Sequence, residues 1–81
     1  MNWPSMIMMI SEKMTFKSFF RRTAAGNLRR EFKHVQLIVG EGKDGRFYFG
    51  IVYPDQSEKW SRGYFSESEA MMSLEEYVSD F

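Results

Sequence analysis

Residues 46–53, RFYFGIVY, predict a β-strand at the centre of a sheet. Aromatic and β-branched side chains are enriched in strands, and successive side chains of a strand point to opposite faces. The first predicted face carries Phe47, Phe49, Ile51 and Tyr53, and the second carries Tyr48 and Val52. Because both faces are apolar, we expect this strand to have neighbours on both sides.

A second strand is predicted just before it, over residues 34–39, where valine and leucine alternate with other side chains. Residues 40–45 are polar and rich in glycine, as in a hairpin loop. Gly40, Gly42 and Gly45 match the Gly-x-Gly-x-x-Gly pattern of phosphate-binding loops, but that pattern requires a helix to follow. Here a strand follows, so we interpret the run as a hairpin.

A third strand is predicted after the turn residues 54–57, Pro-Asp-Gln-Ser. Over residues 58–64, Trp60, Arg62 and Tyr64 alternate with Lys59, Ser61 and Gly63. The three strands then form an antiparallel meander.

The C-terminal residues predict a helix from Glu67 to about Ser79. Ser66 and Glu69 have the spacing of a capping box, in which each residue satisfies a free N–H at the start of the helix. Phe65 and Ala70 occupy the positions of a hydrophobic staple. The apolar stripe of this helix consists of Ala70, Met71, Leu74, Tyr77, Val78 and Phe81.

An N-terminal helix is also predicted, from Ser11 or Thr15 to Ala25. Its apolar stripe would be Phe16, Phe19, Phe20 and Thr23, at helical spacing. Gly26-Asn27 would end it, and residues 28–33 would add a short helical turn. The predicted fold is therefore α+β, with the order helix, three-stranded antiparallel meander, C-terminal helix (α-β-β-β-α).

The length of 81 residues predicts a single domain spanning residues 1–81, with residues 1–13 irregular or flexible. The absence of cysteine excludes disulfides, thiolate zinc sites and thiol catalysis. The apolar run from Met6 to Ile10 is too short for a membrane span or a signal peptide. We therefore expect a cytoplasmic protein that does not bind membranes.

The formal net charge is zero, so no overall field attracts the chain to nucleic acid. The distribution is uneven, however. Seven of the eleven Lys and Arg lie between Lys13 and His34, whereas residues 65–81 hold five acids and no base. The sequence therefore predicts a basic N-terminal part and an acidic C-terminal helix.

No set of residues in the sequence predicts catalysis. His34 has no second histidine or cysteine with which to share a metal. Glu75 and Glu76 are adjacent, so on a helix they point about 100° apart and do not form a carboxylate pair. No base accompanies the serines. We expect no enzyme activity, no catalytic residues, no cofactor and no metal.

Aromatic residues make up 17% of the chain and have no chemistry to serve, which predicts a binding function. The expected partner is another protein, since Tyr, Trp and Arg dominate protein interfaces. The candidate residues for it are Tyr48, Tyr53, Trp60, Arg62, Tyr64, Glu69, Glu75 and Glu76. In one version of this hypothesis the acidic helix mimics nucleic acid towards a basic protein.

The alternative hypothesis is DNA or RNA binding through a basic cluster. Its members are Lys17, Arg21, Arg22, Arg29, Arg30 and Lys33. Homo-oligomerisation through Met6 to Ile10 or through an edge strand is a further alternative.

From Val35 onward, the order of strands, loop and capped helix resembles the small βββα half of HicB-like antitoxins. The most similar piece is residues 63–70, Gly-Tyr-Phe-Ser-Glu-Ser-Glu-Ala. The same order is similar to the DNA-binding modules of AP2 factors and phage-integrase arms. The shared residues are turn and cap residues, so no functional residue carries over. Small, methionine-rich, cysteine-free chains also resemble accessory proteins of phages and mobile elements, including inhibitors.

Overall fold

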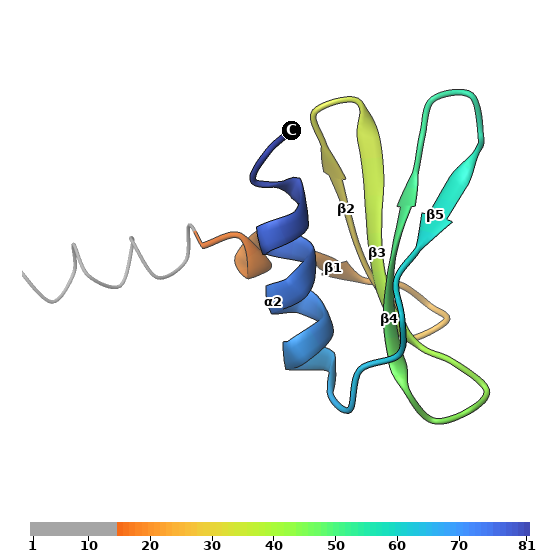
Figure 1. Ribbon diagram of the computed structural model, residues 1–81. Coiled ribbons are helices and arrows are strands. Elements are labelled where there is room, and N and C mark those ends of the chain that lie inside the picture. Colours follow the sequence, from red (N-terminus) through yellow and green to blue (C-terminus); the bar gives the residue numbers. More distant parts are fainter. Residues whose placement is uncertain (1–14) are drawn as a thin grey trace, which may run out of the picture.

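The computed structural model describes residues 15–81, so the predictions for residues 1–13 and for Met6 to Ile10 lie outside the described part. Over these residues the fold is a five-stranded antiparallel sheet with one α-helix packed on it (Figure 1). The elements are, in order, the 3₁₀ helix η1 (Lys17–Phe19), β1 (Arg21–Arg22), β2 (Leu28–Phe32), β3 (Val35–Glu41), β4 (Phe47–Val52), β5 (Glu58–Trp60) and α2 (Glu67–Val78). The α+β class is confirmed.

The core lies between α2 and the two central strands. Leu37 of β3 and Ile51 of β4 are paired across the sheet, and both are fully buried with Leu74 of α2. The other buried core residues are Leu28, Val35, Val39, Phe49, Ala70, Met71 and Val78. The two predicted central strands and their faces are thus confirmed.

The N-terminus of α2 has the predicted cap. The Ser66 hydroxyl accepts a hydrogen bond from the Glu69 N–H at 3.1 Å. The Glu69 carboxylate reaches back, but it accepts from the Phe65 N–H at 3.2 Å and not from Ser66. The predicted staple is wrong, because Phe65 is 80% exposed while Ala70 is fully buried. Phe65 instead lies against the guanidinium group of Arg46.

The predicted N-terminal helix is wrong over the described residues. Only the three residues of η1 are helical, and Phe20 already has an extended backbone that leads into β1. The phenylalanines at helical spacing instead form a cluster on the sheet. Phe16 contacts Phe20 and Phe32, with ring centroids 5.3 and 5.9 Å apart. Packing against Phe32 therefore outweighs the local helical pattern.

The predicted helical turn over residues 28–33 is also wrong, because these residues form β2. Leu28 and Phe32 are four residues apart, a spacing that suits one face of a helix and one face of a strand equally well. In the strand, Arg30 lies between them on the same face. Lys33 lies in the turn between β2 and β3, where its φ is 55°. The three-stranded meander is consequently a five-stranded one.

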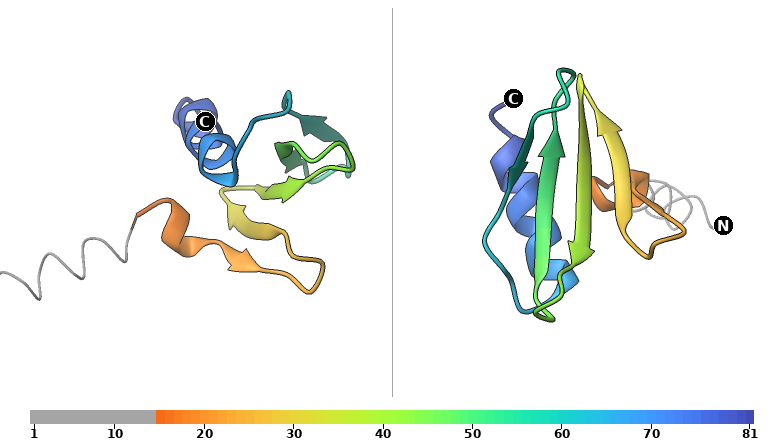
Figure 2. Two further views of the ribbon diagram at one scale, coloured as in Figure 1. Left: turned by 90° about the horizontal axis from the view of Figure 1, so that it is seen from below. Right: turned by 90° about the vertical axis from the view of Figure 1, so that its right-hand side faces the viewer.

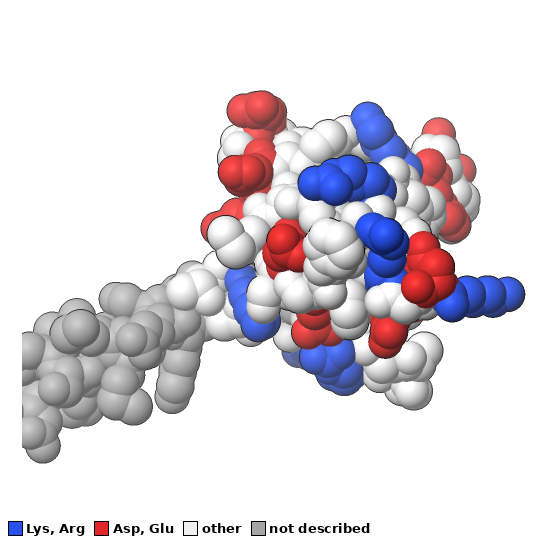
Figure 3. Space-filling model, turned by 60° about the horizontal axis from the view of Figure 1, so that its bottom comes forward, with Lys and Arg blue, Asp and Glu red and all other residues white. Residues whose placement is uncertain are grey.

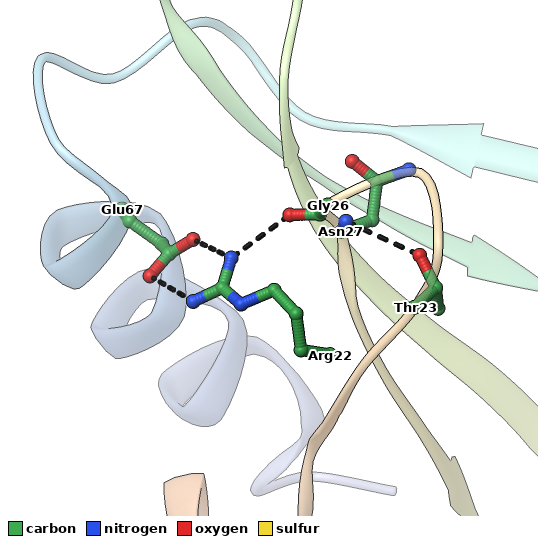
Figure 4. A network of polar contacts seen from close by, with 5 residues as sticks. All are labelled: Arg22, Thr23, Gly26, Asn27 and Glu67. Carbon is green, nitrogen blue, oxygen red and sulfur yellow. Dashed lines mark hydrogen bonds and ion pairs between the residues drawn. The ribbon is translucent and has the colours of Figure 1, made fainter.

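The first strand and the C-terminal helix are tied together by an ion pair (Figure 4). Arg22 of β1 donates to both carboxylate oxygens of Glu67 at the start of α2, at 3.0 and 3.3 Å. Arg22 also donates to the Gly26 carbonyl, and the Asn27 N–H donates to the Thr23 hydroxyl. These contacts hold the β1–β2 turn beside the helix.

The third predicted strand is shorter than expected, because the chain bulges after Trp60. Trp60 pairs with Gly50 and Tyr64 with Phe47, so four residue steps on one side oppose three on the other. The Ser61 hydroxyl accepts the Phe49 N–H at 2.9 Å within this bulge. The extra residue places Trp60 and Tyr64 on opposite faces of the sheet, contrary to the predicted alternation.

Candidate binding surface

The face of the sheet opposite α2 is uncovered by any element of residues 15–81, and we call it the open face. The right-hand view of Figure 2 looks onto it, with α2 behind the sheet, and the left-hand view shows η1 on the same side as α2. One row of paired residues crosses all five strands on the open face. It consists of Arg21, Arg29, Ile38, Gly50 and Trp60.

Trp60 lies flat on the open face because Gly50 has no side chain. A Cβ atom at Gly50 would come within 2.6 to 2.7 Å of three atoms of the indole ring. The Trp60 side chain remains 50% exposed, and its Nε1 donates to a carboxylate oxygen of Glu58 at 2.9 Å. One side of the indole is therefore seated on the sheet, and a large part of the ring is free for contact.

A second glycine produces a hollow beside Trp60. The Asn27 side chain lies over Gly40, so closely that a Cβ there would meet its Oδ1 at 2.2 Å. Asn27 and Trp60, the side chains that cover these two glycines, both line a shallow hollow of about 390 Å³. Its lining is Asn27, Ile38, Gly40, Glu41, Gly42, Tyr48, Trp60 and Ser61. A hollow of this composition suits an apolar side chain.

Tyr48 on the rim of the hollow is held by the hairpin loop. Its hydroxyl donates to the Asp44 carboxylate, which also accepts from the Arg46 N–H. These two hydrogen bonds, chiefly the first, hold the pKa of Asp44 below its ordinary value. The same carboxylate raises the pKa of the Tyr48 hydroxyl. The hydrogen bond to Asp44 thereby holds the phenol ring beside the hollow.

Two arginines continue the row away from the hollow. Arg21 and Arg29 are direct cross-strand partners on the open face, and both are exposed. Within residues 15–81 neither guanidinium group makes a hydrogen bond or an ion pair. Like charges directly opposite each other in a sheet are destabilising. The pair is thus a local cost to the fold that an anionic partner would relieve.

The residues predicted to bind a protein partner fall on two surfaces. Tyr48 and Trp60 are together at the hollow on the open face. Tyr53 and Tyr64 are on the covered face and pack against the core, with Tyr64 stacked on Phe49. The rest lie towards the helix, with Arg62 over the Tyr64 ring and exposed Glu69, Glu75 and Glu76 on α2.

The predicted basic cluster is divided by the sheet. Only Arg21 and Arg29 lie on the open face. Arg22 is occupied by Glu67, and Arg30 lies 4.9 to 6.0 Å from the rings of Phe16, Phe19, Phe20 and Phe32. Lys17 belongs to η1, and Lys33 donates to the Phe81 carbonyl beyond α2. The six side chains therefore do not form one continuous basic surface.

Charges of both signs are interspersed over the face that Figure 3 shows. The open face has the same character, because Glu31 pairs with Gln36 and Glu58 with Val52 one row away from the arginines. A mixed surface of this kind favours specific local charge pairs over a long-range field.

The sequence did not single out the residues whose role depends on close contact with a residue of another strand. Gly40 and Gly50 lie inside strands, where a glycine marks the close contact of another group. That signal was present at Gly50, in the middle of an otherwise aromatic and branched strand. Asn27 and Ile38 carried no comparable signal, since their place on the surface depends on the β2–β3 pairing.

Within residues 15–81, no three acidic or histidine side chains are close enough to hold a metal ion. No helix of this part of the chain is both long and apolar enough to cross a membrane. Comparison with known proteins found no matching family, no matching characterised relative and no matching solved structure.

Proposed function

We propose that this protein is a non-enzymatic binding protein whose open face contacts another protein. The observation that carries the proposal is Trp60, seated on Gly50 and half exposed beside an apolar hollow, with two arginines in the same row. Tryptophan and arginine are the residues most enriched at the energetic centres of protein interfaces. Its proposed role is that of a small inhibitor or modulator of the phage or mobile-element type.

A protein partner is favoured over nucleic acid by the charges of the open face. Nucleic-acid binding proteins neutralise several phosphates with clustered cations. Here Arg21 and Arg29 share the face with Glu31 and Glu58. Glu58 also accepts a hydrogen bond from the indole of Trp60. A backbone of phosphates crossing this face would meet carboxylates on the next row.

The second candidate function is binding of single-stranded DNA or RNA. It is supported by the placement of Trp60, a stacking surface, in one row with Arg21 and Arg29. This function requires affinity that falls steeply as salt rises. A titration of a labelled 12-nucleotide oligo(dT) at low and at high salt tests it.

The protein-binding proposal is tested by placing a photo-crosslinking amino acid at one exposed site on each surface. Gln36 is the site on the open face, and Glu75 on α2 is the matched control. Irradiation in a lysate of the source cells should give a discrete protein adduct from Gln36 that persists after nuclease treatment. Replacing Trp60 by Ala should remove that adduct.

Adducts from the two sites have opposite meanings. A discrete adduct from Glu75 alone would contradict the open-face proposal and place the interface on α2. A nuclease-sensitive adduct from Gln36 would move the assignment to nucleic acid. The variant with Glu69, Glu75 and Glu76 all changed to Lys tests the acidic-mimic hypothesis, because that hypothesis requires the partner to be lost.

A further inference from the structure

We infer that the hollow beside Trp60 and the Arg21–Arg29 pair form one continuous site for an extended, acidic segment of a protein. The inference rests on the proposed function and specifies the chemistry of the partner. In this site the hollow binds one apolar side chain of the segment. The two guanidinium groups bind carboxylates that precede or follow that side chain in the segment's sequence. The segment lies across the strands, along the row that runs from Trp60 to Arg21.

The spacing along this row fits an extended chain. Arg29 is the direct partner of Ile38, which lines the hollow, and Arg21 is one strand further away. Neighbouring strands are about 4.8 Å apart, so the arginine Cα atoms lie roughly 5 and 10 Å beyond Ile38. In an extended chain, side chains on one face repeat every ~6.6 Å. Acids two and four residues from the apolar side chain therefore come within reach of Arg29 and Arg21.

The electrostatics favour carboxylates in this row and disfavour them in the next. Arg21 and Arg29 repel each other and have no acidic partner among residues 15–81. A carboxylate beside both would relieve that repulsion and would accept charge-assisted hydrogen bonds from the two guanidinium groups. Glu31 and Glu58 occupy the neighbouring row and would repel an acidic segment placed there. The acids of the face thus set the path of the segment.

A second copy of this chain does not supply such a segment from its described residues. Phe65, Glu67 and Glu69 have the required spacing, but both glutamates lie in the first turn of α2, where Glu67 is paired with Arg22 and Glu69 accepts from the Phe65 N–H. Carboxylates spaced for an extended chain must therefore come from a different protein.

The test uses short acetylated and amidated peptides and the full chain. The probes are Glu-Gly-Glu-Gly-Leu-Gly and the reverse order Gly-Leu-Gly-Glu-Gly-Glu, since the structure does not set the direction. The control, Glu-Gly-Gly-Leu-Glu-Gly, has the same composition, but its acids lie at odd-numbered separations from the leucine and so point to the opposite face of an extended chain. Because the chain contains only Trp3 and Trp60, a Trp3→Phe background makes Trp60 fluorescence the reporter. One of the two probes should bind about tenfold more tightly than the control, a difference of roughly 1.4 kcal/mol.

A charge swap makes the test specific. Arg29→Glu should weaken the preferred probe about tenfold and should bind the peptide in which lysine replaces glutamate. Glu75→Lys on α2 is the matched control and should leave both affinities unchanged. Equal binding of probe and control peptides, or binding that Arg29→Glu does not alter, would overturn the inference. So would oligo(dT) binding that displaces the peptide.

The two proposals fail in distinguishable ways. If the Gln36 cross-link forms and no peptide binds with the predicted spacing, the open face is an interface for a partner of other chemistry. If neither the cross-link nor the peptide binding is seen, the proposed function fails as well.

Discussion

The two faces of the sheet are built from the same strands but differ in what their glycines and side chains do. On the covered face, Leu37 and Ile51 are paired, fully buried and in contact with the core that α2 closes. On the open face, one residue along, Ile38 is paired with Gly50, and Trp60 lies over that glycine while half exposed. The covered face is packed against α2 of the same chain. The open face carries an aromatic side chain that no element of residues 15–81 covers.

The difference indicates that the open face is not an incomplete core. A core is filled by apolar side chains packed to high density from both sides. On the open face Gly50 makes room for the indole of Trp60, and the unpartnered pair Arg21 and Arg29 lies in the same row. A row that carries both features lowers stability and leaves contact groups exposed, as the proposed binding surface requires.

The largest predicted effect comes from a truncation on the covered face. Ile51→Ala should lower the free energy of unfolding by about 2–5 kcal/mol, because it removes buried methylene groups and leaves a cavity. Ile38→Ala, the corresponding truncation on the open face, should cost about 1 kcal/mol, since part of that side chain is already exposed. Urea denaturation of both variants measures the difference. Equal losses would contradict the distinction between the faces.

A smaller effect is predicted for Gly50→Ala, which adds one methyl group beneath the indole. The ring must move, and the free energy of unfolding should fall by about 1 kcal/mol. Trp60 fluorescence in the Trp3→Phe background should shift to longer wavelength as the ring leaves the sheet. In a Trp60→Ala background the same glycine substitution should cost nothing, so a double-mutant cycle checks the contact. An unchanged cost in that background would place the clash elsewhere.

The smallest effect is a pH dependence at the rim of the hollow. The Tyr48 hydroxyl lowers the pKa of Asp44, so this contact stabilises the fold above the ordinary carboxylate pKa and is lost as pH falls through the lowered value. The raised pKa of Tyr48 gives the matching loss at alkaline pH, as pH rises through the raised value. Tyr48→Phe should therefore raise the Asp44 pKa measured by NMR. The stability gap between wild type and variant should narrow as pH falls through the lowered pKa of Asp44. Asp55, whose pKa is lowered by Ser57 instead, is the internal control.

The C-terminal two thirds of the fold could be predicted from the sequence because its patterns are local. The alternation in residues 47–53 and the Ser66 cap each depend on side chains a few residues apart. The β5 bulge could not be predicted, because the Ser61 hydroxyl that accepts the Phe49 N–H looks like any polar strand residue in the sequence.

The N-terminal part was predicted wrongly because its spacing fits two structures. Phe16 and Phe20 are one helical turn apart, yet Phe16 also packs against Phe32, a residue distant in the sequence. Tyr48 and Trp60, two of the residues predicted to bind a partner, lie together at the hollow. The role of Arg21 and Arg29 as a pair was not predicted, because their pairing exists only once residues 21–30 form a hairpin.

The order of the strands has a consequence for how the chain folds. Each strand pairs only with its neighbours in the sequence, so every pairing closes a short loop and costs little chain entropy. The contacts that must bridge a long stretch of chain are those between α2 and the sheet, together with the Arg22–Glu67 ion pair, whose partners are 45 residues apart. The meander can therefore be joined hairpin by hairpin, and docking of α2 on the sheet closes the longest loops and completes the core.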